Sequence, residues 1–450
     1  DNRRIQLRDT GDSQRAYQGD VMKAPQILSG FQDLLPGDMI ARNKVMSMIR
    51  SVFESHGFEP IETPSLEYYE TLTGKEGGES EMLMYDFTDH GDRHVGLIYD
   101  LTVPISRVMA TYQDIPKPFK RYQIQRVYRA ERPQKGRFRE FYQCDVDIFG
   151  TASPLSDAEI VSILSDSLVG MGFKDFNVLV NHRGVMQGIM RTCGVPKETL
   201  KESIVIVDKL DKIGPDGVAR ELEAKGVPSA GKIVEMISVQ GDAGVVIPTL
   251  KGMLSGDEEA VQALDNIKQI IELAGAMNAK VKFDPSLARG QSYYTGPVFE
   301  ARLETPKIGS VAGGGRYDNL IGIFSGNQVC ATGASLGIDR IMAAMREIGM
   351  ISDTKTIAKV QICHFGEGST PLALECAKTI RESGVPCDLY CGDGDIRKQI
   401  KYASKKGVPY IAIIGEDEAK SSTVLIKNME TGEQEKVEFS KLGGVASQLA

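Results

Sequence analysis

The sequence predicts an α+β protein that is built from several domains. Residues 26–186 mix helical and strand patterns, whereas residues 187–278 are dominated by helical patterns broken by Gly and Pro. From residue 357 onward strands and helices alternate, which is typical of a small α/β domain with a largely parallel sheet. A chain of 450 residues is also too long to share a single hydrophobic core.

The composition is that of an ordinary folded protein. Hydrophobic residues make up 41% and charged residues 25% of the chain. No apolar run approaches the ~20 residues that span a bilayer. Residues 1–25 are polar, carry both charges and lack the apolar stretch of a secretory signal, so we expect a flexible N-terminal arm.

The cysteine pattern favours a reducing compartment. The seven cysteines are odd in number and scattered, as reduced core thiols are. Cys387 and Cys391 are spaced like metal ligands, but no histidine or second cysteine pair completes a zinc site. We therefore expect a cytoplasmic protein, with additional targeting to an organelle as the alternative.

The first mixed region contains four recognisable patterns. Residues 39–57, MIARNKVMSMIRSVFESHG, have helical periodicity that stops at Gly57. FEPIETPSLEY follows and is expected to be extended because of its two prolines. HVGLIYDLTVPISRVMATY predicts a strand that runs into a helix. FKRYQIQRVYRAE and RFREFYQCDVDIFG alternate on either side of the polar tip RPQKG, which predicts an antiparallel hairpin.

The tip of that hairpin concentrates positive charge in a chain whose net charge is -8. The span RVYRAERPQKGRFREF contains the cations Arg126, Arg129, Arg132, Lys135, Arg137 and Arg139. Strand alternation would place Arg129 with Glu131, and Arg137 with Arg139, on one cationic face flanked by aromatic rings. Guanidinium groups suit phosphate oxygens, so this face favours phosphate or nucleotide binding. A solvated edge hairpin is the alternative.

Further segments combine arginine with glycine and tyrosine. LARGQSYYTG places Arg289 in a glycine-flanked turn before Tyr293 and Tyr294. ATGASLGIDRI carries two glycines before Arg340. GGGRYD has three glycines followed by an arginine, Tyr317 and an aspartate. Glycines allow a ligand to approach the backbone closely, although neither common phosphate-binding glycine motif is present, so ordinary helix packing stays an alternative.

An acidic and polar set accompanies these cations: Asp100, Thr102, Gln143, Asp145 and Asp147. In CDVDIF the two aspartates share one face of an alternating strand. They are expected either to face a pocket or to be exposed strand carboxylates.

Together these segments resemble the histidyl-tRNA synthetases, a family of class II aminoacyl-tRNA synthetases. RAERPQKGRFREFYQCDVD is similar to motif 2, ATGASLGIDRI to motif 3, and the helix at 39–57 with FEPIETPSLE to motif 1. ARGQSYYTG and GGGRYD resemble the two signatures peculiar to this family, and LIYDLTVPISR with QCDVD leans towards its eukaryotic-type branch. The resemblance covers about residues 28–445, and five motifs in order make it specific.

The resemblance implies a class II catalytic core, an antiparallel sheet flanked by helices. The core would come in two parts, 26–186 with motifs 1 and 2 and 279–350 with the histidine signatures and motif 3. The helical insertion at 187–278 would lie against the tRNA acceptor stem, and the α/β domain at 357–450 would bind the anticodon. The implied partners are tRNA(His), L-histidine and a second copy joined through motif 1, with no membrane and no DNA.

The implied activity is ATP-dependent ligation of histidine to its tRNA through a histidyl-adenylate, with ATP and Mg²⁺ as cofactors. The histidine carboxylate would attack the α-phosphorus while fixed arginines stabilise the charge that develops. No protein ligand is assigned to the metal. The alternative is a non-catalytic relative with a regulatory or tRNA-sensing role. Such relatives tend to lose the catalytic arginines or the anticodon domain, and this chain keeps both.

The residue roles that the family implies fall into four groups. The catalytic residues are Arg289, Arg129 and Arg340. The ATP-binding residues are Arg129, Glu131, Arg137, Phe141 and Arg340. The histidine-binding residues are Asp100, Thr102, Gln143, Asp147, Arg289, Tyr293, Tyr294 and Tyr317. The tRNA-binding residues are Gln134, Arg397 and Lys401, and for the last two a solvated helix face is the alternative.

Three residues, at two places in the chain, depart from the family pattern. Gln291-Ser292 stands where the family usually has Leu-Asp, and Ile98 stands where it usually has Arg. One acid and one base are therefore absent together. The hypothesis is that in relatives these two charges form an ion pair, which requires that positions 98 and 292 lie within ~4 Å reach of each other.

Overall fold

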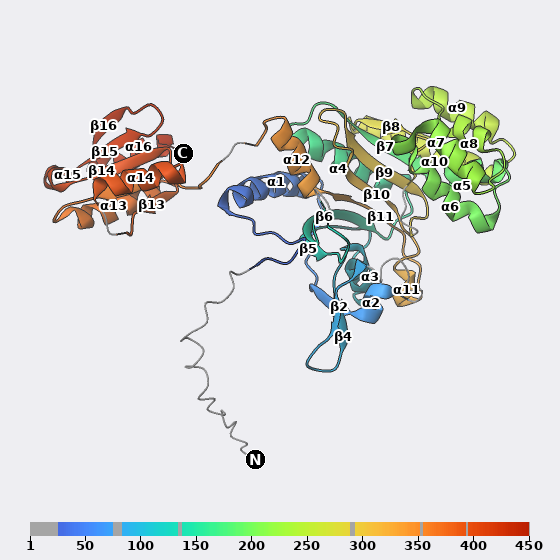
Figure 1. The fold of residues 1–450 in the computed structure, drawn as a ribbon, viewed down its shortest axis with the longest axis horizontal. Helices are drawn as coiled ribbons and strands as arrows, with labels where there is room; N and C mark the ends of the chain where they lie inside the picture. The colour runs from blue at the N-terminus through green and yellow to red at the C-terminus, as the bar shows by residue number, and fades with distance from the viewer. Residues whose placement is uncertain are drawn as a thin grey trace, which may run out of the picture.

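The computed structural model describes residues 26–74, 83–133, 137–288, 293–351, 354–392 and 395–449. Figure 1 shows a large unit built on a β-sheet, with a block of helices at one end, and a smaller C-terminal unit that stands apart from it. Within the described residues, no helix is both long enough and apolar enough to cross a lipid bilayer.

An eight-stranded sheet forms the centre of the large unit. In spatial order its strands are β1 (Glu59–Pro60), β5 (Phe119–Tyr128), β6 (Glu140–Phe149), β11 (Ala331–Leu336), β10 (Ser310–Arg316), β9 (Pro297–Leu303), β7 (Phe176–His182) and β8 (Val281–Phe283). The inner strands pair antiparallel, and the edge strands β1 and β8 pair parallel. The antiparallel core that the resemblance implies is confirmed, with a parallel strand added at each edge.

Strands β5 and β6 form the expected hairpin, paired from Phe119 opposite Phe149 to Tyr128 opposite Glu140. Strand alternation sorts the side chains of β6 into two faces. Cys144, Val146 and Ile148 are buried in the main hydrophobic core, so the polar residues between them face the other side of the sheet. One face of the sheet therefore packs in the main core, and the opposite face, called the free face below, carries the polar residues of β6.

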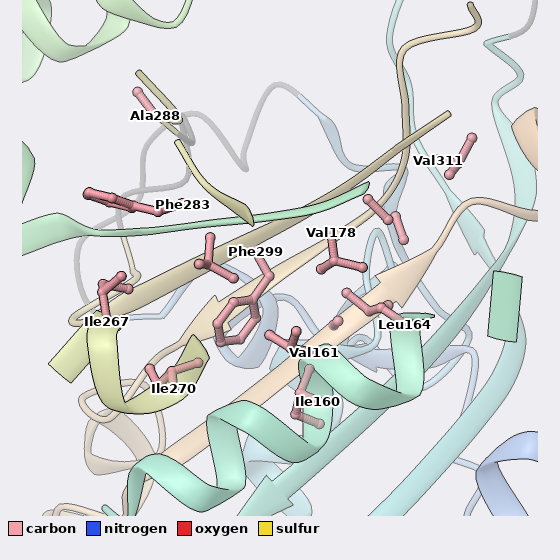
Figure 2. Packing of buried hydrophobic residues seen from close by; sticks show 14 of the residues in the cluster. Ile160, Val161, Leu164, Val178, Ile267, Ile270, Phe283, Ala288, Phe299 and Val311 are labelled. Carbon is pink, nitrogen blue, oxygen red and sulfur yellow. The ribbon is translucent and has the colours of Figure 1, made fainter. Parts of the chain in front are cut away.

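Helices cover the packed face of this sheet. They are α1 (Pro36–Ser55), α4 (Pro154–Gly170) and α12 (Ile338–Glu347). Helix α4 starts with a proline at its first turn and with the Ser153 side chain accepting a hydrogen bond from the Leu155 amide, a favourable N-terminal cap. Figure 2 shows Ile160, Val161 and Leu164 of α4 packed near Phe299 of β9.

Six helices lie between β7 and β8 in the chain. They are α5 (Arg183–Thr192), α6 (Lys197–Val207), α7 (Leu210–Ala224), α8 (Ala230–Ile237), α9 (Ala243–Met253) and α10 (Glu258–Ala276). Helix α10 packs against both α5 and α4, and Ile267 and Ile270 of α10 belong to the main core (Figure 2). The helical block is thus continuous with the core of the sheet.

A second, three-stranded sheet lies near the free face of the large sheet (Figure 1). Its order is β2 (Leu66–Tyr68), β4 (His94–Leu97) and β3 (Asp86–Thr88), and α2 (Tyr69–Thr73), α3 (Thr102–Thr111) and α11 (Gly322–Ser325) accompany it. The strand-to-helix step predicted from HVGLIYDLTVPISRVMATY is present as β4 followed by α3. This step places Asp100 and Thr102 at the start of a helix.

The C-terminal unit is an α/β domain, as expected, but its sheet is only half parallel. Its strands, in order, are β13 (Cys387–Leu389), β12 (Val360–His364), β14 (Tyr410–Ile414), β15 (Thr423–Asn428) and β16 (Gln434–Glu438), with helices α13 (Ser369–Glu382), α14 (Ile396–Lys406), α15 (Glu416–Ser421) and α16 (Leu442–Ala446). Strands β15 and β16 pair antiparallel. The prediction of a largely parallel sheet is wrong there because short connections return the chain antiparallel, whereas only a long crossover makes parallel neighbours.

Candidate active site

A cavity of about 370 Å³ opens on the free face of the large sheet. Strands β6, β10 and β11, the tip of the β5–β6 hairpin and the starts of α3 and α12 supply its walls. The predicted ligand-binding residues that line it are Asp100, Thr102, Arg129, Glu131, Arg137, Phe141, Gln143, Asp147, Tyr293, Tyr294, Tyr317 and Arg340. Arg289 and Gln134 lie outside the described residues.

Arginine side chains line part of the cavity. The Arg129 guanidinium lies 5.0 Å from the centre of the Phe141 ring, and its Nε donates a hydrogen bond to the Tyr99 carbonyl oxygen at 3.1 Å. Arg340, in the first turn of α12, donates from Nη1 to the Ser310 carbonyl oxygen at 2.7 Å. Arg137 on the hairpin tip is exposed. These contacts leave further N–H groups on each arginine available to an anion.

Carboxylates and phenols also line the cavity. Asp147 accepts a short hydrogen bond from the Tyr317 hydroxyl, and its second oxygen lies 2.6 Å from Nη2 of Arg121. Asp100 accepts a hydrogen bond from the Val103 amide at 3.0 Å, which fixes it at the start of α3. Gln143 lies beside Ser335, with Nε2 donating to Oγ at 3.3 Å. These carboxylate and amide oxygens are suited to binding a group that carries N–H donors.

Burial shapes the protonation of these carboxylates. Removal from water raises the pKa of Asp100 and of Asp147, and it raises the pKa of Asp145 to about 7. The nearby guanidinium of Arg121 acts in the opposite direction on all three groups. The charge of these carboxylates therefore depends on a cation that does not itself line the cavity.

Two family models match the chain, Histidyl-tRNA synthetase over residues 30–341 and Anticodon binding domain over residues 359–449. The chain belongs to the histidyl-tRNA synthetase family. It is 42% identical to a histidine--tRNA ligase of Aeropyrum pernix, over 91% of this chain and 95% of that relative. It is 38% identical to a histidine--tRNA ligase of Cytophaga hutchinsonii, over 94% and 99% of the two chains.

A solved member of the family has the same fold along almost its whole length. The crystal structure of histidyl-tRNA synthetase from Nostoc sp. PCC 7120 superposes with a TM-score of 0.85 at 28% sequence identity. The match covers 96% of this chain and 100% of that one. Both the two-part core and the C-terminal domain are therefore shared with this histidyl-tRNA synthetase.

Within this synthetase fold, the expectation of one continuous cationic face on the hairpin is wrong for Arg139. Its Nε donates to the Glu131 carbonyl oxygen at 2.9 Å, and its Nη1 donates to the Ser29 carbonyl oxygen at 3.1 Å. Arg139 therefore holds the segment before α1 and does not line the cavity. The physical reason is that β5 ends at Tyr128 and β6 begins at Glu140, so strand alternation does not extend through the tip.

The roles predicted from the sequence did not include Arg121 or Ser335, and for Asp145 only a position facing a pocket was among the expectations. Asp145 and Ser335 line the cavity, and Arg121 lies buried beneath it. A signal for Arg121 exists, because it alternates with Gln123 and Gln125 along β5, on the face that pairs with Asp145 and Asp147. Polar residues at every second position of a strand indicate a polar face, but not that this face is buried.

The departure at Ile98 is compatible with the packing around it. Ile98 is fully buried against Leu72, Leu101 and Val127 in a small apolar cluster. A charged side chain there would need a partner to offset its desolvation. Gln291 and Ser292 lie outside the described residues, so the hypothesis of a lost ion pair stays a prediction.

The basic residues of the C-terminal domain lie on α14. Arg397 and Lys401 are exposed on this helix, which is capped by Asp395 accepting from the Lys398 amide. Lys406 is already occupied, since it lies 2.6 Å from Asp388 and above the Tyr402 ring. Arg397 and Lys401 form no ion pair within the residues that the structure describes.

Within the described ranges, no three His, Cys, Asp or Glu side chains gather as metal ligands do. All seven cysteines are free thiols, including Cys387 and Cys391.

Proposed function

We propose that the chain is a histidine--tRNA ligase, which joins histidine to its tRNA through a histidyl-adenylate. The observation that carries this proposal is the convergence of Arg129, Arg137 and Arg340 on one cavity that Asp100 and Asp147 also line. The relatives from Aeropyrum pernix and Cytophaga hutchinsonii, both named histidine--tRNA ligase and matched over nearly their full length, support it.

The arginines suit the first chemical step. The histidine carboxylate attacks the α-phosphorus of ATP, and negative charge accumulates on the non-bridging oxygens as pyrophosphate leaves. Guanidinium groups fixed on different elements stabilise that charge without reorganising. No general base is required because a carboxylate is already a nucleophile. Phe141 offers a face for the adenine ring, Glu131 lies at the adenine end, and we place Arg289 between the α-phosphate and the attacking carboxylate.

The carboxylates and phenols that line the cavity are suited to binding the histidine. We assign Asp100, Thr102 and Gln143 to the α-amino group, and Asp147 and Tyr294 to the imidazole, with Tyr293 and Tyr317 beside them. A buried carboxylate and phenol lose their partners when an amino acid without N–H donors enters. Sites of this kind discriminate strongly, so a separate editing activity is not required.

ATP is the proposed nucleotide substrate, and Mg²⁺ is the metal expected to bind with it. The described residues offer no three-ligand acidic cluster, which fits a metal held chiefly by the nucleotide's own phosphates. When bound, the metal neutralises part of the phosphate charge. The arginines bind and orient the remaining oxygens.

The second step transfers the histidyl group to a ribose hydroxyl of the tRNA. We place the acceptor end near Gln134 on the motif 2 loop, the acceptor stem against the helical block, and the anticodon stem near Arg397 and Lys401. We also propose a homodimer joined through α1, no DNA or membrane partner, and a cytoplasmic location. The spellings LIYDLTVPISR and QCDVD support a place near the eukaryotic-type branch, which a phylogenetic tree would test.

Exchange of labelled pyrophosphate into ATP tests the proposal. The purified chain should catalyse exchange that depends on histidine and not on the other amino acids. Arg289→Gln should abolish exchange while circular dichroism and the melting temperature stay close to wild type. Wild-type protein without histidine-dependent exchange would favour the alternative of a regulatory or tRNA-sensing relative, and a fully active Arg289→Gln would refute the assigned role.

A further inference from the structure

A fully buried arginine lies beneath the cavity. The Arg121 side chain on β5 has a relative exposure of 0%. Its Nη2 lies 2.6 Å from the Asp147 carboxylate, and the two residues are directly opposite each other on β5 and β6. Burying a guanidinium costs free energy unless a partner compensates, and hydrophobic residues would fill the same space more cheaply. The position of Arg121 therefore indicates a role in the site.

A second carboxylate shares this guanidinium. Asp145 is two residues before Asp147 on the same face of β6, is buried and lines the cavity. Ser335 on β11 hydrogen-bonds the Asp145 carboxylate. The Oδ1 atom of Asp145 is buried and has no hydrogen-bond partner within the residues that the structure describes. A buried acceptor that faces a cavity without a partner indicates that a bound molecule supplies the donor.

The oxygens of the two carboxylates have different neighbours. One oxygen of Asp147 is occupied by the Tyr317 hydroxyl, and the other lies against Arg121. Oδ1 of Asp145 has no such neighbour, and Oδ2 of Asp147, although close to Arg121, likewise has no hydrogen-bond partner within the described residues. Without a cation between them, two buried carboxylates at alternate positions of one strand would repel each other, and one would take up a proton.

We propose that Arg121 is a positioning residue that holds Asp145 and Asp147 together as hydrogen-bond acceptors, with Asp145 accepting an imidazole N–H of the bound histidine. This inference rests on the proposed ligase function and deepens it. Histidine recognition in this chain then depends on a guanidinium that the substrate does not touch.

The charged and titratable groups around Arg121 come from every neighbouring element. They are Asp145 and Asp147 on β6, Asp100 before α3 and Tyr317 after β10. Burial raises the pKa of both β6 aspartates, and Arg121 opposes that rise. Loss of the guanidinium should therefore raise both pKa values further, and the acceptors should become protonated as the pH falls through the new values.

The experiment measures the KM for histidine and the KM for ATP in the exchange reaction between pH 6 and pH 9. Arg121→Met should raise the KM for histidine at pH 7 by ~10-fold or more, because acceptors for a charged or polar donor are lost. The acidic limb of its pH profile should move upward by roughly 1 to 3 pH units. The KM for ATP should stay at the wild-type value. Arg121→Lys keeps the charge and should restore most of the wild-type profile.

A matched control exists on the same sheet. Arg302 on β9 forms ion pairs with Glu300 and Asp211, outside the cavity. Arg302→Met removes an arginine–carboxylate pair and should leave both KM values and the pH profile as in wild type. A change in pH profile confined to Arg121→Met then cannot be a general consequence of losing an arginine–carboxylate ion pair on this sheet.

The possible outcomes separate the inference from the function. A wild-type KM for histidine in Arg121→Met, or an equal rise in the KM for both substrates, overturns the inference. If Arg121→Met does not fold, Asp145→Asn carries the test. It should raise the KM for histidine by ~10-fold or more at an unchanged KM for ATP, and a wild-type KM overturns the inference. Absence of histidine-dependent exchange in the wild-type chain contradicts the proposed function before any variant is compared.

Discussion

Gly333 on β11 makes room for the carboxylate of Asp147 on β6. The two residues are directly opposite each other in the sheet, and a Cβ added at Gly333 would lie 1.8 Å from Oδ1 of Asp147. The same Cβ would lie 2.7 Å from the Val146 carbonyl oxygen, which cannot move away as a side chain can. The absence of a side chain at Gly333 thus sets the position of a carboxylate in the cavity.

Gly333→Ala should displace Asp147 and weaken histidine binding. Because displacements of about 1 Å in a positioned group cost ~10²-fold, we expect a loss of kcat/KM for histidine of about that size. Overpacking should also cost about 1 to 3 kcal/mol of stability. Exchange kinetics and thermal melts measure both. Gly275→Ala, in an exposed position of α10 with no atom near the added Cβ, is the control and should keep full activity.

Arg42→Met should affect the ATP side of the cavity. Nη2 of Arg42 on α1 lies 2.5 Å from Oδ1 of Asp339, the cavity residue just before Arg340. Breaking this partly buried pair should cost about 1 to 3 kcal/mol of stability. Since the start of α12 loses an anchor, the KM for ATP should rise more than the KM for histidine.

A second ion pair between the same helices provides the control for Arg42→Met. Arg346 lies 2.6 Å from Asp38, but both side chains are 49% exposed. Arg346→Met should therefore change the free energy of unfolding by less than ~1 kcal/mol and leave the KM for ATP unchanged. Equal effects of the two substitutions would contradict the proposed link between α1 and the nucleotide site.

Arg340→Gln should lower kcat in the exchange reaction by about 10² to 10³-fold, the cost of losing one charge-stabilising donor. The side chain is exposed, and its recorded hydrogen bond goes to the Ser310 carbonyl oxygen. We therefore expect a melting temperature close to wild type. Pyrophosphate exchange and circular dichroism test this together, and unchanged kcat would remove Arg340 from the catalytic set.

His56 should make stability depend on pH. It follows α1, and its two ring nitrogens lie 3.3 Å from Glu159 and 3.0 Å from Asp166 on α4. Hydrogen bonding to Glu159 first, with that to Asp166, raises the pKa of His56 above 6.5 despite its burial. The stabilisation is therefore fully present below pH 6.5 and is lost as the pH rises through the raised pKa.

The partner of His56 titrates at the other end of the pH range. The hydrogen bond from His56, with help from Lys120, lowers the pKa of Glu159 to about 2, so its contribution is lost only as the pH falls towards that value. Between pH 6 and pH 8 the melting temperature of wild type should therefore fall relative to that of His56→Gln. His94→Gln removes an exposed histidine–aspartate contact and should leave the slope unchanged. Parallel wild-type and His56→Gln curves would contradict the assignment.

Local patterns predict much of this fold because they have local causes. The helix predicted to stop at Gly57 ends at Ser55, and Gly57 adopts φ 75°, a conformation that glycine adopts without strain. The alternation in CDVDIF correctly separates the aspartates from the apolar residues between them. Each of these features depends on a few neighbouring residues.

Features that depend on distant partners were not predictable in the same way. On β5 the polar residues Arg121, Gln123 and Gln125 are more buried than Ile124. Asp147 on β6 pairs with Arg121, and the segment between β1 and β2 supplies hydrogen-bond partners to the two glutamines. Alternation identifies two faces of a strand but does not say which face another element covers. The contact of Arg139 with the chain before α1 has the same character, since nothing near Arg139 in sequence indicates it.

The central claim is that this cavity makes histidyl-tRNA. Its most direct test is the charging of a histidine tRNA by the purified chain with labelled histidine, ATP and Mg²⁺. The account predicts ester-linked histidine on the tRNA, lost when either ATP or histidine is omitted and absent with any other amino acid. A well-folded chain that leaves the tRNA uncharged, or that charges it with a different amino acid, would contradict the account.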